Sequence, residues 1–395
     1  PPSEPGMRRA ALLAPLTGFL LVFFVLPLAW LFSLAVREAE VARALPRTLV
    51  TLQGWTAAQP LPPALFPAFA QDLVQAREAQ TLADAARRLN YAVNGVRSTL
   101  MRAARAVGSA EPGTPFDAAF FEQLDPTLAS PAFFVAVQEA RGPVSAFYLL
   151  SALDLQRDAS GAITPAPEDQ RIYLQVLHRT LFISATVTGL CLLLGFPVAA
   201  LLTQVSGRKA DLLMAMVMLP FWTSLLVRTA AWVVLLQREG LVNTLLLKVG
   251  LIAAPLELIY NRTGVLIAMT HVLLPFMILP IYSTLKDMPP NYLRAAASLG
   301  APPVTAFFKV YLPLAAPGIA AGALMVFIMA LGYYITPALV GGGGDQMLSY
   351  FVAKYTTETG NWGLAAALGG LLLATTLGLY AVSQRLSGGR PAGMA

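Results

Sequence analysis

The stretch DMPPNYLRAAASLGAPPVTAFFKVYLPLAAPG, at residues 287–318, is a polar interruption between two long apolar segments. Pro289 and Pro290 fit only the start of a helix, because proline lacks the amide hydrogen that an interior helical residue donates. Gly300, followed closely by two further prolines, is typical of a helix end. The spacing therefore predicts a short helix over residues 291–299, with a second helix directly after it.

One face of this predicted helix is nearly flat. It carries, at helical spacing, Leu293, Ala296, Ala297 and Gly300. Since small side chains allow another backbone to come close, we expect this face to contact another protein. The alternative is an ordinary helix-turn-helix between two membrane spans.

The rest of the chain has the composition of a membrane protein: 56% of its 395 residues are hydrophobic and only 12% are charged. Segments that can cross about 30 Å of hydrocarbon lie at residues 10–36, 173–203, 211–237, 263–285, 313–340 and 361–386. We interpret the first as a retained span, because it is too long for a signal peptide and lacks a convincing cleavage site.

The net charge of +6 does not indicate a nucleic-acid partner, because the basic residues lie mostly in the connections between apolar segments. In a six-span arrangement one side of the membrane carries Arg8, Arg9, Arg208, Lys209, Lys286, Arg294, Lys309, Arg385 and Arg390. Positively charged connections are cytoplasmic as a rule. We therefore expect both termini and the 287–312 loop inside the cell.

Residues 37–171 form a domain-sized polar insertion after the first span, which this orientation places outside the cytoplasm. Its pattern predicts one long helix over 64–107, helical pieces near 116–124 and 132–141, a strand-like run over 147–154 and a turn at 157–161. Two roles stay open for this insertion: a docking site for a solute-binding protein, or a cap that stabilises the membrane helices. The lone cysteine, Cys191, excludes an internal disulfide.

Enzyme chemistry is not indicated, and we expect no catalytic residue, no metal site and no cofactor in this chain. There is no phosphate-binding loop, and the run of four glycines before Asp345 lacks the lysine and hydroxyl residue that such a loop needs. We interpret that run as a turn or a flexible outer gate. His178 and His271 have no third ligand at metal spacing. We interpret His271 as a hydrogen-bonded membrane histidine, and a proton or pathway role is the alternative.

Aromatic and charged groups at the ends of spans are candidates for a substrate path. They are Trp222, Thr223, Arg228, Tyr333, Tyr334 and Asp345. Aromatic rings with a nearby carboxylate can recognise an organic cation. The competing explanation is an interfacial aromatic belt, which would also include Trp30, Trp232 and Trp362.

The spacing of Ala295, Ala296, Gly300 and the later Leu312-Pro313 resembles the EAA loop of permease subunits of binding-protein-dependent ABC importers. In that family the loop is a coupling helix that docks on a cytoplasmic ATPase. Arg294 stands where the family usually has glutamate. The resemblance thus implies the packing role of the alanine and glycine positions and includes Leu312 and Pro313 in the coupling loop, but it does not imply the salt bridge of that glutamate.

Residues 172–386 extend the resemblance. The segments LPFWTSLLVRTAAW (219–232), LGYYITPALVGG (331–342) and NWGLAAALGG (361–370) are similar to the polyamine, or spermidine/putrescine, branch of this family. The resemblance implies a type I importer fold with six transmembrane helices in a bacterial inner membrane. It also implies a second permease subunit of a different sequence, an ATPase dimer that binds ATP and Mg, and an extracytoplasmic solute-binding protein.

We therefore expect an all-α permease that moves a small, polyamine-like solute by alternating access. One alternative is a secondary transporter driven by an ion gradient, with His271, Arg228 and Asp345 as its charged elements; no inverted repeat supports it. The other is a membrane-anchored sensor or enzyme that uses residues 37–171.

Overall fold

A computed structural model describes the chain except for residues 1–12, 38, 158–161 and 387–395. Its contacts divide it into two compact units. The first comprises residues 1–170 and 361–367, and the second comprises residues 171–360 and 368–395.

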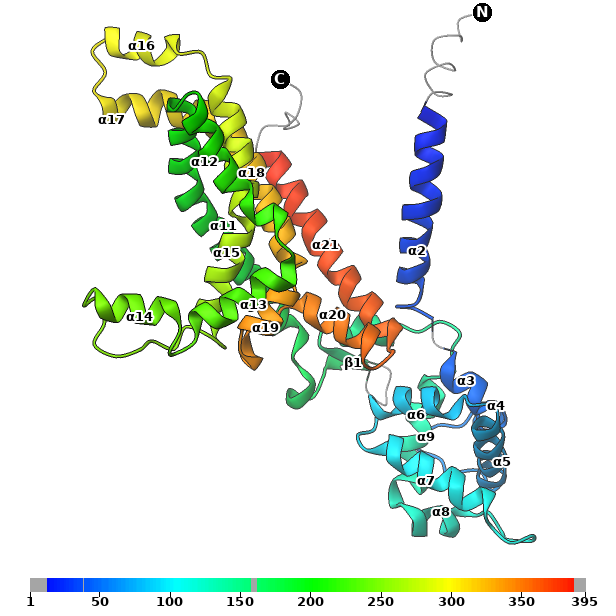
Figure 1. The fold of residues 1–395 in the computed structure, drawn as a ribbon. Coiled ribbons are helices and arrows are strands. Elements are labelled where there is room, and N and C mark those ends of the chain that lie inside the picture. Colours follow the sequence, from blue (N-terminus) through cyan, green and yellow to red (C-terminus); the bar gives the residue numbers. More distant parts are fainter. Residues whose placement is uncertain (1–12, 38, 158–161, 387–395) are drawn as a thin grey trace, which may run out of the picture. The chain divides into compact units, whose positions relative to one another are not determined.

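The first unit opens with an apolar helix, Leu13–Ser33, which contains the π-helical η1 (Leu21–Val25) and α2 (Leu26–Ser33). None of its residues is buried. The insertion that follows is built from α3 (Glu40–Ala44), α4 (Pro46–Thr51), α5 (Leu65–Glu78), α6 (Leu82–Asn90), α7 (Val96–Gly108), α8 (Ala118–Leu124), η2 (Pro126–Ala129) and α9 (Pro131–Glu139) (Figure 1).

The insertion has a hydrophobic core of its own. Its largest fully buried side chains include Phe69, Phe121, Phe133 and Phe134, whose rings meet at centroid distances of 5.0 to 5.7 Å. The helices near 116–124 and 132–141 are confirmed as α8 and α9. The prediction of a single helix over 64–107 is wrong. The chain turns between α5, α6 and α7, and the apolar residues of these three helices pack against one another in the core.

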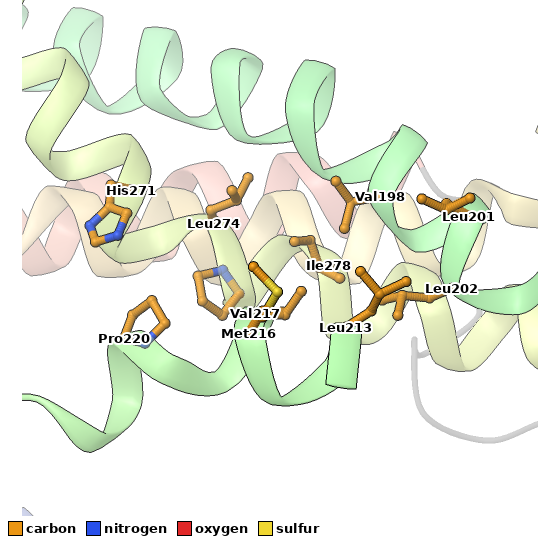
Figure 2. A pocket seen from close by; sticks show the side chains of 11 residues that line it. Val198, Leu201, Leu202, Leu213, Met216, Val217, Pro220, His271, Leu274 and Ile278 are labelled. Carbon is orange, nitrogen blue, oxygen red and sulfur yellow. The ribbon is translucent and has the colours of Figure 1, made fainter. Parts of the chain in front are cut away.

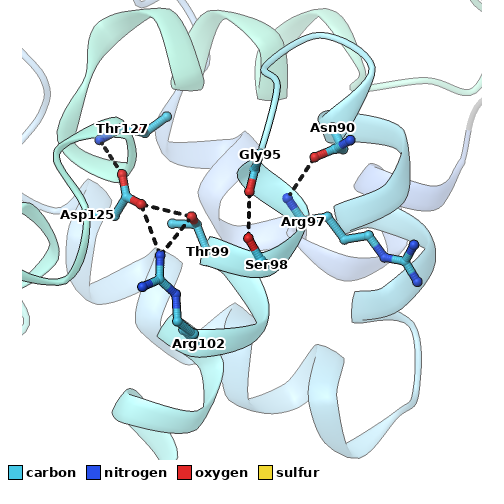
Figure 3. A network of polar contacts seen from close by, with 8 residues as sticks. All are labelled: Asn90, Gly95, Arg97, Ser98, Thr99, Arg102, Asp125 and Thr127. Atoms are coloured by element: carbon cyan, nitrogen blue, oxygen red, sulfur yellow. Dashed lines mark hydrogen bonds and ion pairs between the residues drawn. The ribbon is translucent and has the colours of Figure 1, made fainter.

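A polar network joins α7 to η2 in this insertion (Figure 3). The carboxylate of Asp125 accepts hydrogen bonds from the amide of Thr127 at 3.0 Å, the hydroxyl of Thr99 at 2.9 Å and Nη2 of Arg102 at 3.2 Å. The hydrogen bonds from Thr127 and then from Thr99, with the charge of Arg102, hold the pKa of Asp125 below its ordinary value.

The strand expected over 147–154 is wrong. Residues Phe147–Ala152 form α10, and the strands follow it as β1 (Leu155–Arg157) and β2 (Ile163–Pro165), which pair in antiparallel register. Tyr148 and Ala152 are both buried and lie four residues apart, which is the helical spacing that decides this segment. A short 3-10 turn, η3 (Glu168–Gln170), ends the insertion, and residues 158–161 of the predicted turn lie outside the described part of the chain.

Three long helices make the core of the second unit: α11 (Tyr173–Gln204), α15 (Arg262–Lys286) and α18 (Leu312–Leu331). In Figure 1 they run alongside one another. Gly318 and Gly322 let α18 approach α15 closely; a Cβ atom on Gly322 would lie only 3.0 Å from the sulfur of Met277. Small residues at such crossings are a common feature of membrane helix packing.

Two of the predicted spans are broken in the structure. The segment over 211–237 divides into α12 (Arg208–Trp222) and α13 (Leu225–Leu236), which is followed by α14 (Leu241–Lys248). The segment over 313–340 stops at the end of α18 and resumes as α19 (Ile335–Val340), followed by η5 (Gly343–Asp345), α20 (Leu348–Thr357) and α21 (Trp362–Leu386).

Within the described residues, six helices are long and apolar enough to cross a membrane. They are Leu13–Ser33, Tyr173–Gln204, Leu225–Lys248, Arg262–Lys286, Pro303–Leu331 and Trp362–Val382. The third lies further along the chain than the predicted segment over 211–237. The expected all-α membrane fold with six spans and a mainly helical insertion after the first is confirmed.

Candidate coupling loop and transport path

The loop between the fourth and fifth spans forms the short helix that its prolines and glycine predict. It is α16 (Asn291–Ser298), which begins after Pro290. Gly300 has a φ of +77°, a left-handed conformation that favours glycine, and the amide of Ala301 donates to the carbonyl of Ala296 at 3.0 Å. The chain then continues through α17 (Pro303–Ala306) and the π-helical η4 (Phe307–Tyr311) into α18.

Of the four residues on the predicted face of α16, Leu293, Ala297 and Gly300 are exposed and only Ala296 is buried. Ala296 is only 8% exposed, so its methyl group is turned inward, where α16 contacts α17 and η4. By contrast, Tyr292 is 53% exposed, Leu299 is 88% exposed, and Ala295 between them is exposed as well. These three lie at positions i, i+3 and i+7, which share one side of a helix. We call them the 292/295/299 face.

Sequence reasoning missed Tyr292 and Leu299. Their signal was available, since two large apolar side chains two turns apart in a polar loop are unusual without a partner. Of the other loop residues singled out by sequence, Arg294 is exposed on α16, whereas Leu312 and Pro313 open α18 and end the loop.

The break between α12 and α13 carries three of the predicted path residues. Trp222 ends α12 and is 75% exposed, and Thr223 follows it outside any helix. The Arg228 side chain on α13 reaches back, and its Nη2 donates to the carbonyl oxygen of Thr223 at 2.8 Å. A helix broken inside a membrane leaves carbonyls that need a donor, and Arg228 supplies one.

The second break holds the two tyrosines. Tyr333 and Tyr334 lie between α18 and α19, outside any helix, although the predicted span over 313–340 includes both. The Tyr333 carbonyl accepts from the hydroxyl of Ser349 at 2.7 Å. Its side chain is half-buried, whereas that of Tyr334 is exposed.

The two breaks lie near each other in the second unit. The hydroxyls of Thr229 on α13 and Thr336 on α19 are 3.1 Å apart, and α13 packs against α19. Arg228 lies within electrostatic range of Tyr333 and of His271. The structure thus brings Thr223, Arg228 and Tyr333 into one region.

Asp345 belongs to a different cluster. It is 9% exposed, and Oδ1 of its carboxylate accepts from Nε of Arg262 at 3.1 Å. Arg179 donates to the carbonyl of Gly344 beside it. The negative charge of Asp345 is therefore compensated, and its ion pair ties the glycine run to the start of α15.

A cavity of about 280 Å³ lies among α11, α12 and α15 (Figure 2). Its lining is apolar apart from His271, which lies at one end of it, while Leu201 and Leu202 lie at the other. The Nδ1 atom of His271 accepts from Nε1 of Trp232 at 3.1 Å. Since Nδ1 is the acceptor, the neutral ring carries its proton on Nε2. Among the described residues, no group of three possible metal ligands occurs.

Comparison with known proteins gives a family match over most of the second unit. Residues 191–387 match the family described as "Binding-protein-dependent transport system inner membrane component". The spermidine/putrescine transport system permease protein PotB of Haemophilus influenzae is 35% identical over 218 residues, which cover 54% of this chain and 76% of that protein.

Two further relatives come from Escherichia coli. Its spermidine/putrescine permease PotB is 31% identical over 208 residues, covering 53% of this chain and 75% of that protein. Its inner membrane ABC transporter permease YdcU is 36% identical over 204 residues, which cover 49% of this chain and 65% of that protein.

Fold and site together define a multi-pass transport protein of the inner membrane rather than an enzyme. The chain belongs to the family of inner-membrane components of binding-protein-dependent transport systems, and it is the permease subunit of an ABC importer. The whole insertion, residues 37–171, lies outside the residues that the family match covers.

Proposed function

We propose that this permease moves a polyamine-like organic cation into the cytoplasm by alternating access. The observation that carries the proposal is the 35% identity to a spermidine/putrescine permease over most of that protein's length. Two broken helices that meet in the second unit support it, because broken helices line binding sites in transport proteins and can move as separate halves.

Membership of the family implies a separate ATPase and a solute-binding protein. We further propose that the ATPase is a dimer that binds ATP and Mg, and that it docks on the 292/295/299 face. The apolar exposure of Tyr292 and Leu299 supports this assignment, since a surface that excludes water on docking needs such anchors. The loop and both termini then lie in the cytoplasm of a bacterial cell, and the insertion lies outside.

The rings of Trp222 and Tyr333 are the proposed contacts for the cation, with Tyr334 and Thr223 beside them. Arg228 places a positive charge near Tyr333, but its hydrogen bond to Thr223 directs part of the guanidinium to the helix break. Such a site is weak, which suits a permease that receives its solute from a binding protein. Asp345 contributes at the outer mouth only when its pair with Arg262 opens.

A second permease subunit of different sequence completes the proposed path, because this chain alone leaves a large apolar surface on α12 and α13 for lipid or a partner. For the insertion, docking of the solute-binding protein is the first proposal. A stabilising cap is the second, and the insertion's own phenylalanine core is compatible with both.

The experiment that tests the solute is uptake by the reconstituted transporter of labelled putrescine and spermidine, with a neutral and an anionic solute of similar size as controls. We expect preferential uptake of the cations. Preferential uptake of the neutral or anionic solute would contradict the cation assignment while leaving the permease assignment intact.

A further inference from the structure

One short segment of the insertion is attached to the ends of two membrane spans. The first span ends at Ser33, and just beyond it Val36 accepts a backbone hydrogen bond from the amide of Ser145 at 2.9 Å. Arg37 forms an isolated antiparallel bridge with Val144. Residues 144 and 145 therefore lie where the first span ends.

The start of the sixth span also contacts this segment, through Gly363 and Tyr148. Gly363 is the second residue of α21, and the ring of Tyr148 lies so close to it that any side chain at position 363 would overlap the ring. Trp362 beside it is 51% exposed, and tryptophan is enriched at the boundary between lipid and water. Tyr148 on α10 thus lies at the depth where the sixth span leaves the apolar layer.

At this depth the segment exposes apolar side chains. Val144 is 72% exposed, Leu149 is 41% exposed and Leu153 is 40% exposed. Leu149 lies on α10, and Leu153 directly follows its last residue, four positions further along the chain.

The other side of α10 is fixed to the insertion. Tyr148 and Ala152 are buried, and the guanidinium of Arg88 on α6 stacks at 3.4 Å over the ring of Phe147. The helix therefore has one side held by the domain and one apolar side that the described protein leaves uncovered.

We propose that Val144, Leu149 and Leu153 insert into the interfacial layer of the bilayer, so that α10 anchors the insertion to lipid. Lipid is the occupant because two spans independently hold this segment at the membrane boundary, and because an amphipathic helix there gains by burying its apolar side among acyl chains. Arg141 before it and Arg157 after it are exposed, and their charges suit lipid phosphates. The anchor does not depend on which solute is transported.

The test places an environment-sensitive fluorophore on single cysteines in a Cys191→Ala chain, in nanodiscs of phosphatidylethanolamine and phosphatidylglycerol. Leu149→Cys and Leu153→Cys are the test positions. Met101→Cys on α7 is the matched control, because Met101 is also an exposed apolar residue of the insertion, at 37%. We expect a spin-labelled lipid to quench the two test positions several-fold more than the control, and iodide to quench them several-fold less.

Two further arms separate lipid from other occupants. First, a Leu149→Ser, Leu153→Ser double variant should weaken the lipid quenching of a reporter at Val144→Cys. Second, in the single-cysteine chains the reporters at positions 149 and 153 should be shielded from iodide without any added protein. Iodide quenching of both test positions equal to that of Met101→Cys would overturn the proposal. Shielding that appears only when the solute-binding protein is added would also overturn it, because it would identify a protein-docking surface.

Discussion

Nη2 of Arg228 donates a hydrogen bond to the carbonyl oxygen of Thr223 at 2.8 Å, and so satisfies the backbone at the break between α12 and α13. The same arginine lies within electrostatic range of Tyr333 at the second break. One side chain thus satisfies the backbone at the first break and places its charge near the second.

Arg228→Met keeps an apolar side chain of similar length but removes the donor. We expect it to destabilise the protein by about 0.5–1.5 kcal/mol, the net contribution of one hydrogen bond, and to lower transport. Arg228→Lys should recover part of the loss. Leu226→Met on α13 is the control, because Leu226 is exposed and its variant leaves both the Thr223 carbonyl and its Arg228 donor in place, so it should melt like the wild type. Thermal unfolding in nanodiscs measures these effects, and an unchanged melting temperature for Arg228→Met would contradict this role.

Leu299→Asp should abolish stable binding of the ATPase, because it places a charge on the 292/295/299 face that docking would remove from water. Leu293→Asp is the matched control: Leu293 is 36% exposed and points away from that face, so its variant should retain most of the binding. Ala296→Asp should instead destabilise the loop, because Ala296 is buried. Co-purification with the ATPase distinguishes these outcomes, and equal binding by the 299 and 293 variants would refute the assigned face.

The sequence could predict the number of spans and the helix α16, because span length and the positions of proline and glycine are local properties. The sequence could not show which side of α16 faces outward. That depends on how the helix is rotated about its axis, which is decided by the packing of Ala296 against α17 and η4. The run over 147–154 satisfied both a strand and a helix pattern, and only burial of Tyr148 and Ala152 together resolved it.

The path residues show a second limit of local patterns. The pairing of Asp345 with Arg262 joins residues far apart in the chain, so no spacing rule indicates it. Likewise, Arg228 could be recognised as unusual inside an apolar segment, but its acceptor at Thr223 depends on a helix break that the apolar pattern conceals.

The proposed topology can be tested with two exposed serines. In a Cys191→Ala background, Ser109→Cys in the insertion should react with an impermeant thiol reagent in intact cells, whereas Ser298→Cys on the coupling loop should not. Permeabilised cells provide the control, in which both should react. The opposite labelling pattern would reverse the orientation and remove the basis for ATPase docking on α16.

Asp125 predicts a pH dependence of the insertion's stability. Hydrogen bonds from Thr127 and Thr99, with the charge of Arg102, lower the folded-state pKa of Asp125. Its stabilising contribution is therefore fully present above the unfolded-state pKa and is lost as the pH falls through the folded-state pKa. Asp125→Asn should cost about 1 kcal/mol near pH 7, because hydrogen bonds to a charged acceptor are stronger than those to a neutral one.

Thermal unfolding of the full chain at pH 7 and at pH 3 measures the effect. The difference between wild type and Asp125→Asn should shrink at the lower pH, because pH 3 lies below the ordinary pKa of an aspartate and the unfolded chain there binds a proton that folding must release. A difference that stays constant or grows as the pH falls would rule out this contribution.

Uptake by proteoliposomes that contain this permease, its partner permease and the ATPase tests the central claim most directly. With the solute-binding protein and a labelled polyamine on one side, we predict uptake only when ATP and Mg are present on the ATPase side, and none in the Leu299→Asp variant. Uptake driven by an imposed proton or sodium gradient without ATP, and unaffected by Leu299→Asp, would contradict the assignment as an ATP-driven importer.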